Sequence, residues 1–189
     1  QPYLDVFELQ PFGQQYFNSV YIAVVVTLGT MLVSSLAGYA FARIKFPGAN
    51  ALFLVVLIGL LIPAEVTIVP LFQIFNSLGL INTHWPIILV TTFGAPSVLA
   101  TFIMRQFFIA LPVELEEAAR IDGANAFQQF VNITLPYMIF VMTPYIITQF
   151  TGNINNFNII YLLTRGEPLQ VGNSAGDTDL LVTWLYKLT

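Results

Sequence analysis

Charged residues are scarce in this sequence. Only 8% of its 189 residues are Asp, Glu, Lys or Arg, whereas 57% are hydrophobic. A water-soluble domain usually carries about a quarter charged residues, and a chain of this length cannot enclose so many apolar side chains in a dry interior. The composition therefore indicates a protein that is surrounded by lipid.

Cysteine and clustered basic residues are missing as well. The absence of cysteine excludes disulfides, cysteine–zinc sites and a thiol nucleophile. The formal net charge is −4 and no Lys/Arg cluster occurs, so the basic patch required for nucleic-acid binding is absent. The sequence also lacks a Gly-rich phosphate-binding loop with its lysine, and we expect the chain itself to hydrolyse nothing.

Charge-free stretches indicate five membrane spans, because a bilayer needs about 20 mostly apolar residues per helix. The expected spans are residues 19–42, 49–75, 85–104, 135–150 and 179–189, the last one truncated. Four basic residues then fall on one side of the membrane: Arg43, Lys45, Arg105 and Arg120. Since basic residues collect in the cytoplasm, we expect this side, with the loop 106–134, to be cytoplasmic.

Two of the spans carry features that call for a structural reason. Ser34, Gly38 and Ala42 recur every four residues in the first span, and such a stripe of small residues lets another helix approach closely. In the second span, Glu65 lies beside Pro63. An acid within a membrane is a functional candidate by default, although Glu65 could equally sit at the outer interface and bond backbone groups that the prolines leave open.

Two other groups of polar residues favour ordinary structural roles. His84 is the only histidine and lies in a polar turn, where we expect a surface loop residue rather than a metal ligand or a base. Asp177 and Asp179 precede the last span and are expected to cap it. The chain opens on Gln1 without a basic segment and closes inside an apolar run, so we expect both ends to be cut.

The one charged island runs from residue 112 to residue 123, and residues 111–123 are typical of a short surface helix. Pro112 suits a first helical turn, glutamates follow where the helix dipole favours acids, and Gly123 is a natural stop. Periodicity alone favours a loop helix that lies on the membrane surface. An ordered string of fixed residues adds a second interpretation: Glu117-Ala118-Ala119, Gly123, then Ile133, Leu135 and Pro136.

This string resembles the cytoplasmic signature of permease subunits of ABC importers. The resemblance implies an all-α, polytopic membrane helical bundle of the type I permease fold, with residues 1–189 as a single domain that lacks the first span and most of the last. It also implies that the loop is a coupling helix that docks on an ATPase subunit. The residues expected to couple to the ATPase are Glu117, Ala118, Ala119, Gly123, Ile133, Leu135 and Pro136.

Flanking strings are similar to those of sugar importers of the maltose type. Residues 37–43 (AGYAFAR), 46–48 (FPG) and 78–83 (LGLINT) resemble the smaller permease of these systems. Residues 153–163 (NINNFNIIYLL) and 178–188 (TDLLVTWLYKL) resemble the larger permease and its relatives for maltodextrins and galacto-oligosaccharides. The chain therefore combines characters of both permeases.

The asparagine run is the expected substrate site. In the larger permease, a polar stretch at this point contacts the sugar, and by position this implies Asn153 and Asn156, with Gln149 and Gly152 on the same face. Amide groups both donate and accept hydrogen bonds, which suits sugar hydroxyls. These amides could equally cap a broken helix and bond its freed carbonyls.

The resemblance implies a multi-pass subunit in a bacterial-type plasma membrane that imports oligosaccharides by alternating access. The partners it implies are cytoplasmic ATPase subunits, which bind ATP and Mg²⁺, a second permease and an extracytoplasmic sugar-binding protein. We expect no cofactor, metal or catalytic residue in this chain. A permease for a non-sugar solute is the alternative, and a secondary transporter or an enzyme is disfavoured because Glu65 stands alone and the glutamates of the island share one surface helix.

Overall fold

The computed structural model describes residues 12–169 and 176–187, and its regular secondary structure in these ranges is helical, apart from an isolated β-bridge between Leu169 and Gly176. The expectation of an all-α fold is therefore confirmed. In chain order the helices are α2 (Phe12–Arg43), α3 (Ala49–Ile58), η1 (Gly59–Leu61), α4 (Ala64–Ser77), α5 (Trp85–Phe93), α6 (Ala95–Ala110), α7 (Val113–Ile121), α8 (Ala126–Gln129), the π-helix η2 (Phe130–Thr134), α9 (Leu135–Ile154), α10 (Phe157–Leu163) and α11 (Leu181–Lys187).

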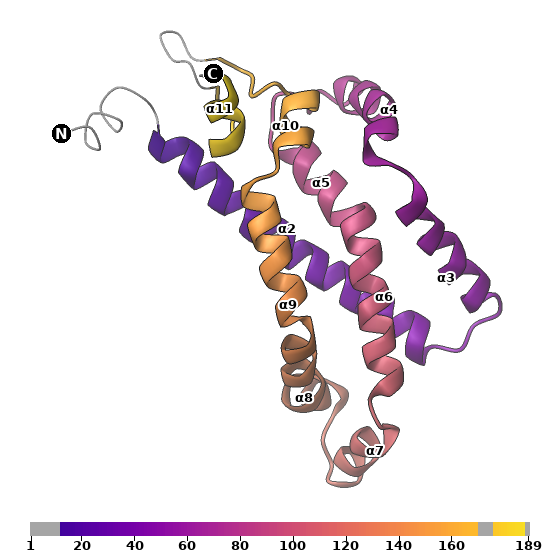
Figure 1. The fold of residues 1–189 in the computed structure, drawn as a ribbon. Helices are drawn as coiled ribbons and strands as arrows, with labels where there is room; N and C mark the ends of the chain where they lie inside the picture. Colours follow the sequence, from indigo (N-terminus) through magenta and orange to yellow (C-terminus); the bar gives the residue numbers. More distant parts are fainter. Residues whose placement is uncertain (1–11, 170–175, 188–189) are drawn as a thin grey trace.

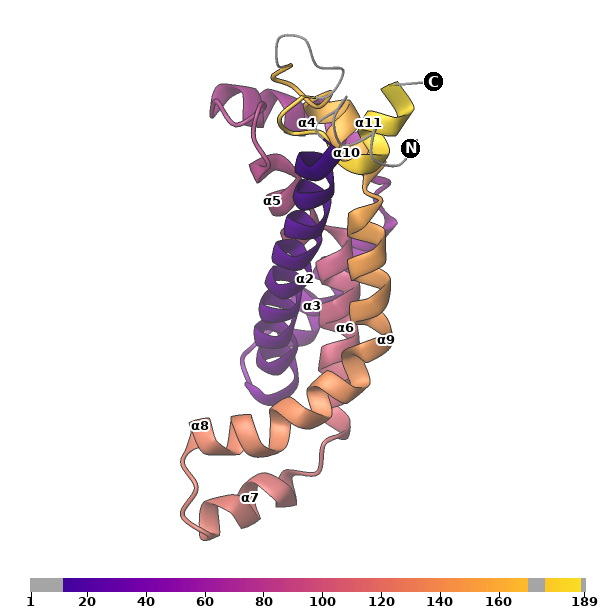
Figure 2. The same ribbon diagram turned by 90° about the vertical axis from the view of Figure 1, so that its left-hand side faces the viewer.

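Three long apolar stretches form the centre of the bundle. Helix α2 packs against α5, α6 and α9, and α6 and α9 also contact each other (Figures 1 and 2). Among the described residues, three stretches are long and apolar enough to cross a membrane: Phe12–Arg43, Trp85–Ala110 and Phe127–Leu163. Each stretch includes one of the expected spans and extends beyond it.

Helices α7 and α8 project from one end of the bundle, which we call the loop end, while α4, α10 and α11 gather at the opposite, far end (Figures 1 and 2). Arg105, on α6, lies at the loop end, since its Nε donates to the carbonyl of Phe41 in the last turn of α2, 3.4 Å away. The ends of the first and third expected spans therefore share one side of the bundle.

The stripe of small residues on α2 marks its closest contact with α6. A Cβ placed on Gly38 would lie 2.6 Å from the Cβ of Met104 and 3.0 Å from the backbone nitrogen of Arg105. Ser34 is fully buried, and Ala42 packs against the apolar cluster formed by α6 and α9. The prediction that this stripe admits a neighbouring helix is confirmed.

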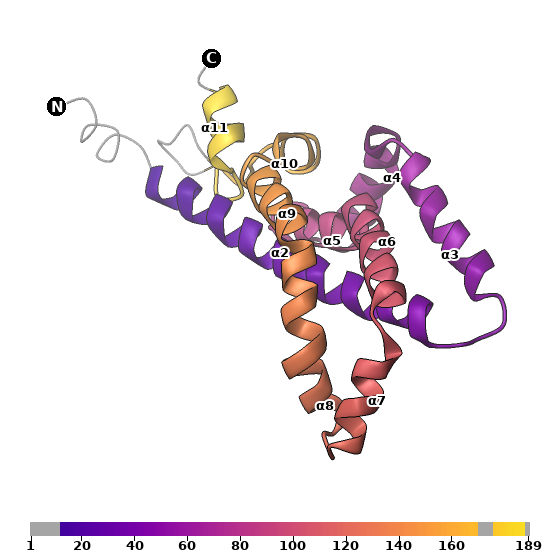
Figure 3. The ribbon, with the colours of Figure 1, turned by 60° about the horizontal axis from the view of Figure 1, so that its bottom comes forward.

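The segment expected to form the second span is broken. Helices α3 and α4 meet at an angle of 101° around η1 and Pro63, and Figure 3 shows the pair on the flank of the bundle beside α6. The prolines were expected to interrupt this segment, and the break follows because Pro63 lacks a backbone N–H and holds Ile62 in an extended conformation. The side chain of Glu65, for which a functional or a structural role was predicted, lies outside the described part of the structure.

The asparagine-rich stretch after the fourth expected span lies between two helices. Helix α9 continues to Ile154, and α10 follows after Asn155 and Asn156, packing against α4, α5 and α11. Apolar residues of α10 account for this helix, because Ile160 and Leu163 are buried and Ile160 joins the core cluster of α2 and α5. The break between α9 and α10 therefore places polar residues between two packed helices.

A buried carboxylate organises the far end. Asp179 has no exposed surface and accepts hydrogen bonds from the N–H of Gly176 (2.8 Å), the hydroxyl of Thr183 (2.9 Å) and the ammonium of Lys187 (2.7 Å). In the described part of the chain, the Asp179 carboxylate does not bond the first backbone amides of α11. The prediction that Asp179 caps this helix is therefore wrong. The side-chain amide of Asn18 on α2 donates to the carbonyl of Asp179, which ties this cluster to the bundle.

Candidate functional site

The charged island forms a helix, α7, that stands clear of the bundle (Figure 2). Pro112 is its N-cap residue, and the side chains of Glu114, Glu117 and Ala118 are exposed while Ala119 is partly buried. The exposed acidic and small side chains leave α7 accessible to a partner protein.

Gly123 ends α7 in a conformation that other residues rarely adopt. Its φ is +83°, its N–H donates to the carbonyl of Arg120 (3.1 Å), and the N–H of Ala124 donates to the carbonyl of Ala119 (2.9 Å). These two bonds make a Schellman motif, in which glycine supplies the left-handed residue after the helix. A Cβ at Gly123 would meet nothing within 4 Å, so the backbone conformation, rather than crowding, favours glycine here. We call this turn at Gly123 the elbow.

We call α7 the first arm of the loop and residues 125–134, which contain α8 and η2, the second arm. The second arm begins with a reciprocal cap that the sequence analysis missed. The N–H of Asn125 donates to the side chain of Gln128, and the N–H of Gln128 donates to the side chain of Asn125, both at 2.9 Å. This is a capping box, and Asn followed three residues later by Gln is the sequence signal that could have revealed it. The box sets the direction of α8 immediately after the elbow.

The remaining signature residues lie where the second arm joins α9. Ile133 belongs to the π-helix η2, and Leu135 and Pro136 form the first turn of α9, with Leu135 packed against the α6–α9 cluster. Such π-turns are rare and frequently occur at functional sites. The structure therefore places the predicted residues on both arms of the loop, with Glu117, Ala118, Ala119 and Gly123 on the first arm.

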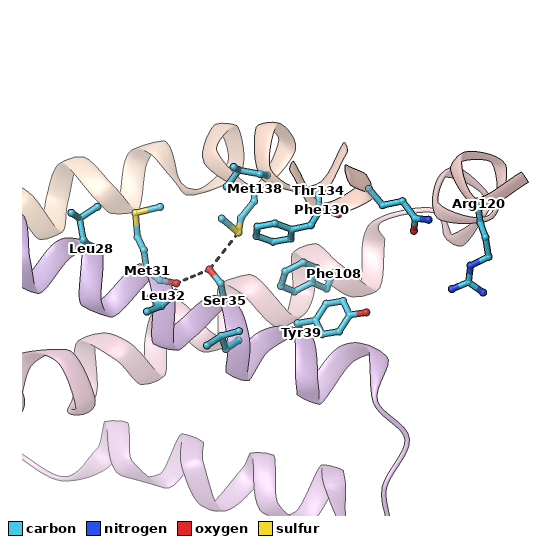
Figure 4. Close-up of a pocket in the computed structure, with 13 residues that line it drawn as sticks. Leu28, Met31, Leu32, Ser35, Tyr39, Phe108, Arg120, Phe130, Thr134 and Met138 are labelled. Atoms are coloured by element: carbon cyan, nitrogen blue, oxygen red, sulfur yellow. Dashed lines mark hydrogen bonds between the residues drawn. The ribbon is translucent and has the colours of Figure 1, made fainter. Parts of the chain in front are cut away.

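A cavity of about 530 Å³ separates the second arm from α2 (Figure 4). Its walls are mainly apolar, and Ser35 on α2 bonds the carbonyl of Met31 (2.6 Å) and approaches the sulfur of Met138 (3.3 Å). Arg120 stands at the end of the cavity that faces the loop, and Gln129 also lines the cavity. The second arm thus reaches the bundle through α9, and the first arm reaches it through α6.

A larger cavity, of about 970 Å³, lies between the broken α3–α4 pair, the α5–α6 junction and the break between α9 and α10. All four residues predicted to contact substrate line it: Gln149, Gly152, Asn153 and Asn156. They come from the last turns of α9 and the residues that follow, so the broken helix brings them together. The four predicted residues therefore line the same cavity, which we call the chamber.

Two buried polar groups in this chamber have no hydrogen-bond partner in the described structure. The Nδ2 of Asn153 and the hydroxyl of Thr91 are both buried and unbonded, and their residues are only 3% and 4% exposed. A buried polar group without a partner is costly, so each such group needs an explanation. The sequence analysis missed Thr91, although a threonine pair just before the Gly94 break of an apolar span was a signal for it.

Asn155, a neighbour of the predicted substrate residues, bonds a carbonyl at the end of α9, as the capping interpretation expects of asparagines here. Asn155 bonds the carbonyl of Thr151 through its side-chain amide at 3.3 Å. Asn156 occupies the N-cap position of α10 but makes no side-chain cap bond. Capping by Asn155 therefore does not account for the amide of Asn153.

The same chamber has aromatic walls and free space beside Gly152. Aromatic side chains of Phe75, Phe93 and Phe157 line it, and a Cβ at Gly152 would meet nothing within 4 Å. Phenylalanine rings provide faces on which a ring of a ligand can stack. The chamber can therefore hold a ligand with polar edges and apolar faces.

His84 lies in a turn, as the sequence predicts, and its side chain is partly buried. It lies before α5 at the far end and lines a cavity of about 330 Å³ with Tyr21, Trp85 and Asp177. Burial lowers the pKa of the His84 imidazole below its usual value of 6.5, and the nearby Asp177 carboxylate opposes this shift. The imidazole is therefore held toward its neutral form.

Both the sequence and the fold are similar to those of known proteins. Residues 30–186 match the family described as the binding-protein-dependent transport system inner membrane component. The chain belongs to this family. It is accordingly an inner-membrane protein, in keeping with its long apolar helices.

Two relatives of this inner membrane component are oligosaccharide transport permeases. A maltodextrin transport system permease protein of Bacillus subtilis is 32% identical over 221 residues, covering 99% of this chain and 50% of the relative. An arabinooligosaccharide transport system permease protein of Halalkalibacterium halodurans is 43% identical over 140 residues, covering 74% of this chain and 49% of the relative. The chain thus spans about half the length of the curated relatives it matches.

The fold is similar to that of a solved transporter. The crystal structure of a bacterial ABC transporter involved in alginate import contains a chain that matches 95% of this one, and 60% of its own length, with a TM-score of 0.75 and 20% sequence identity. The expected ABC permease fold is therefore confirmed.

Proposed function

We propose that this chain is a membrane-spanning subunit of an ATP-driven importer that moves oligosaccharides by alternating access. The observation that carries the proposal is the elbow at the loop end, where Glu117, Ala118 and Ala119 lie exposed or partly exposed on a short helix that Gly123 closes in a left-handed turn. An exposed short helix with small side chains fits a groove on another protein. Its rigid connection to membrane helices allows motion to be transmitted.

The partners follow from this role. Cytoplasmic ATPase subunits bind ATP and Mg²⁺ and dock at α7, a second permease completes the pathway, and an extracytoplasmic sugar-binding protein delivers the substrate. The loop end then faces the cytoplasm, as the basic residues of the sequence predict. In this scheme the chain binds neither nucleotide nor metal, and its task is to convert ATPase closure into opening and closing of the chamber.

The chamber supports an oligosaccharide as the substrate. Asn153 and Thr91 offer buried, unbonded polar groups, and Gln149 and Asn156 add further amides. Sugar hydroxyls both donate and accept hydrogen bonds and so match amide and hydroxyl side chains. No Lys, Arg, Asp or Glu is among the described residues that line the chamber, which favours an uncharged solute.

The test is purification of the complete transporter from cells that carry the native chain or one of two charge reversals. Glu117→Lys is expected to lose the ATPase subunit, because the reversed charge lies in the docking helix. Glu114→Lys is the matched control, since it makes the same reversal on the same exposed helix outside the signature. ATPase recovered with each variant, per amount of permease, is the measurement.

The outcomes separate the two parts of the proposal. If the native permease folds but never recovers an ATPase, or if both reversals behave like the native chain, docking through α7 is wrong. If the ATPase is recovered but vesicles containing the complex take up a non-sugar solute instead of oligosaccharides, the importer stands and the substrate is wrong.

A further inference from the structure

Two arginines connect α2 and α6 reciprocally at the loop end. Arg43, the last residue of α2, donates from Nη2 to the carbonyl of Leu111, which follows α6, at 2.8 Å. Arg105, on α6, donates from Nε to the carbonyl of Phe41 in α2 at 3.4 Å. Each helix therefore supplies a cation to a carbonyl at the end of the other.

The carbonyl of Leu111 occupies a mechanically important position. Leu111 is buried, its N–H closes the last turn of α6 on Phe107, and its ψ of 121° turns the chain away from the helix. Pro112 follows, so the helix cannot continue and the preceding residue stays extended. Leu111 and Pro112 are thus the whole connection between α6 and the coupling helix α7.

Helix electrostatics favour Arg43 in this place. The C-terminal end of a helix carries partial negative charge, and its last carbonyls lack partners within the helix. Arg43 lies at the C-terminal end of α2 and bonds a carbonyl at the C-terminal end of α6. One guanidinium therefore serves two helix ends, which explains why a cation is favourable there.

Arg105 extends the connection to α3. Its Nη2 donates to the side chain of Asn50 at 3.3 Å, and its guanidinium carbon lies 4.4 Å from the centre of the Phe53 ring. Guanidinium groups are attracted to aromatic faces at this separation. The close approach of α2 and α6 at Gly38 brings Arg105 within reach of both neighbouring helices.

We propose that Arg43 and Arg105 form a clamp that transmits displacement of α7 to α2 and α3. Without Arg43, the Leu111–Pro112 connection can shift relative to α2 and absorb a pull on α7 before it reaches that helix. With Arg43 in place, the carbonyl of Leu111 is fixed to α2, and Arg105 ties that end of α2 to α6 and α3. Both arginines are positioning residues, and the clamp rests on the proposed coupling of this chain to an ATPase.

The experiment measures oligosaccharide transported per ATP hydrolysed in proteoliposomes that contain equal amounts of the assembled transporter. Arg43→Gln is expected to lower this ratio about tenfold, within the range of about 5- to 150-fold typical of coupling between sites. Arg43→Lys keeps the charge and one donor and is expected to recover part of the ratio. Lys45→Gln removes a neighbouring exposed cation from the same end and is expected to leave the ratio unchanged.

A second variant tests whether the two arginines act together. Arg105→Gln is expected to lower the ratio as well, and the double variant to lower it by less than the product of the two single effects, because both changes open one clamp. Multiplying effects would show two independent contacts and would overturn the clamp.

A purely structural role predicts a different result from coupling. If Arg43→Gln reduces the amount of assembled complex while the surviving complex keeps the native ratio, the clamp does not transmit motion. If the native complex itself shows no ATP-dependent uptake, the proposed function fails and the coupling role fails with it. If the native complex and the Arg43→Gln variant transport the same amount of oligosaccharide per ATP hydrolysed, the clamp is wrong and the proposed function stands.

Discussion

At the scale of single residues, the chamber separates two asparagines that the sequence presents as equivalent. Asn155 bonds the carbonyl of Thr151, whereas the amide of Asn153 is buried without a partner in the described structure. Residue type and spacing predicted amides at this place but not which of them is free. That distinction depends on where α9 ends, and the run of asparagines does not fix that residue.

The difference predicts opposite effects of two matched substitutions. Asn153→Leu is expected to lower apparent affinity for the transported sugar about 5- to 10-fold, the value of one hydrogen bond of about 1–1.5 kcal/mol. It should not lower thermal stability, because it removes an unbonded buried amide. Substrate dependence of uptake and thermal unfolding in detergent measure the two effects.

Asn155→Leu serves as the control for this pair. It is expected to lower stability, because the carbonyl of Thr151 loses a donor, with little change in apparent affinity. If Asn153→Leu destabilises the protein as Asn155→Leu does and leaves uptake unchanged, Asn153 has a structural role and the chamber does not use it for substrate.

At the scale of helices, α2 determines how closely the bundle packs. Gly38 lies against Met104 and the backbone of Arg105, while a Cβ placed on Gly13, near the start of the same helix, would meet nothing within 4 Å. Glycine in a helix interior usually costs stability relative to alanine. Its presence at position 38 is therefore explained by the contact with α6.

This contrast predicts the outcome of two glycine substitutions in one helix. Gly38→Ala is expected to lower the free energy of unfolding by about 1–3 kcal/mol, because the added methyl forces α2 and α6 apart. Gly13→Ala is expected to be neutral or stabilising by up to about 1 kcal/mol. Equal effects of the two substitutions in denaturant unfolding would contradict close packing at Gly38.

Sequence reasoning predicted features that depend on local spacing and left open those that depend on packing. The small-residue stripe of α2 and the stop of α7 at Gly123 depend on local spacing, and both are present in the structure. The angle between α3 and α4, and the formation of α10 after the asparagines, depend on packing against distant helices. Thr91 was missed for the same reason, since only the fold brings it to the residues that follow α9.

At the scale of the whole molecule, the two ends are built differently. The loop end is connected by arginine-to-carbonyl bonds between helices, whereas the far end is closed around the buried carboxylate of Asp179. Asn18 and Ser19 on α2 bond the backbone around Asp179 and Leu181. These bonds therefore attach residues 176–187 to α2, although the two segments lie far apart in the sequence.

Neutralising the buried carboxylate is expected to loosen this end selectively. Asp179→Asn removes the charge that pairs with Lys187 and should cost about 1.5–3 kcal/mol, the range for a hydrogen bond to a charged group. Hydrogen exchange should rise in residues 176–187 and stay unchanged in α7. Glu167→Gln neutralises a partly exposed carboxylate at the same end and should leave exchange as in the native protein, and an equal rise in both variants would contradict the role of Asp179.

The π-turn of η2 has a consequence for length changes in the second arm. Helical side chains advance by about 100° per residue, and a π-turn contains one residue more than the α-turn it replaces. Deleting one residue within Phe130–Thr134 would convert the turn into regular α-helix and rotate α8 by about 100° relative to α9. The phase between the elbow and the α9 residues that line the chamber is therefore set by a single inserted residue, and homologous loops that differ by one residue here would present a different face to the same partner.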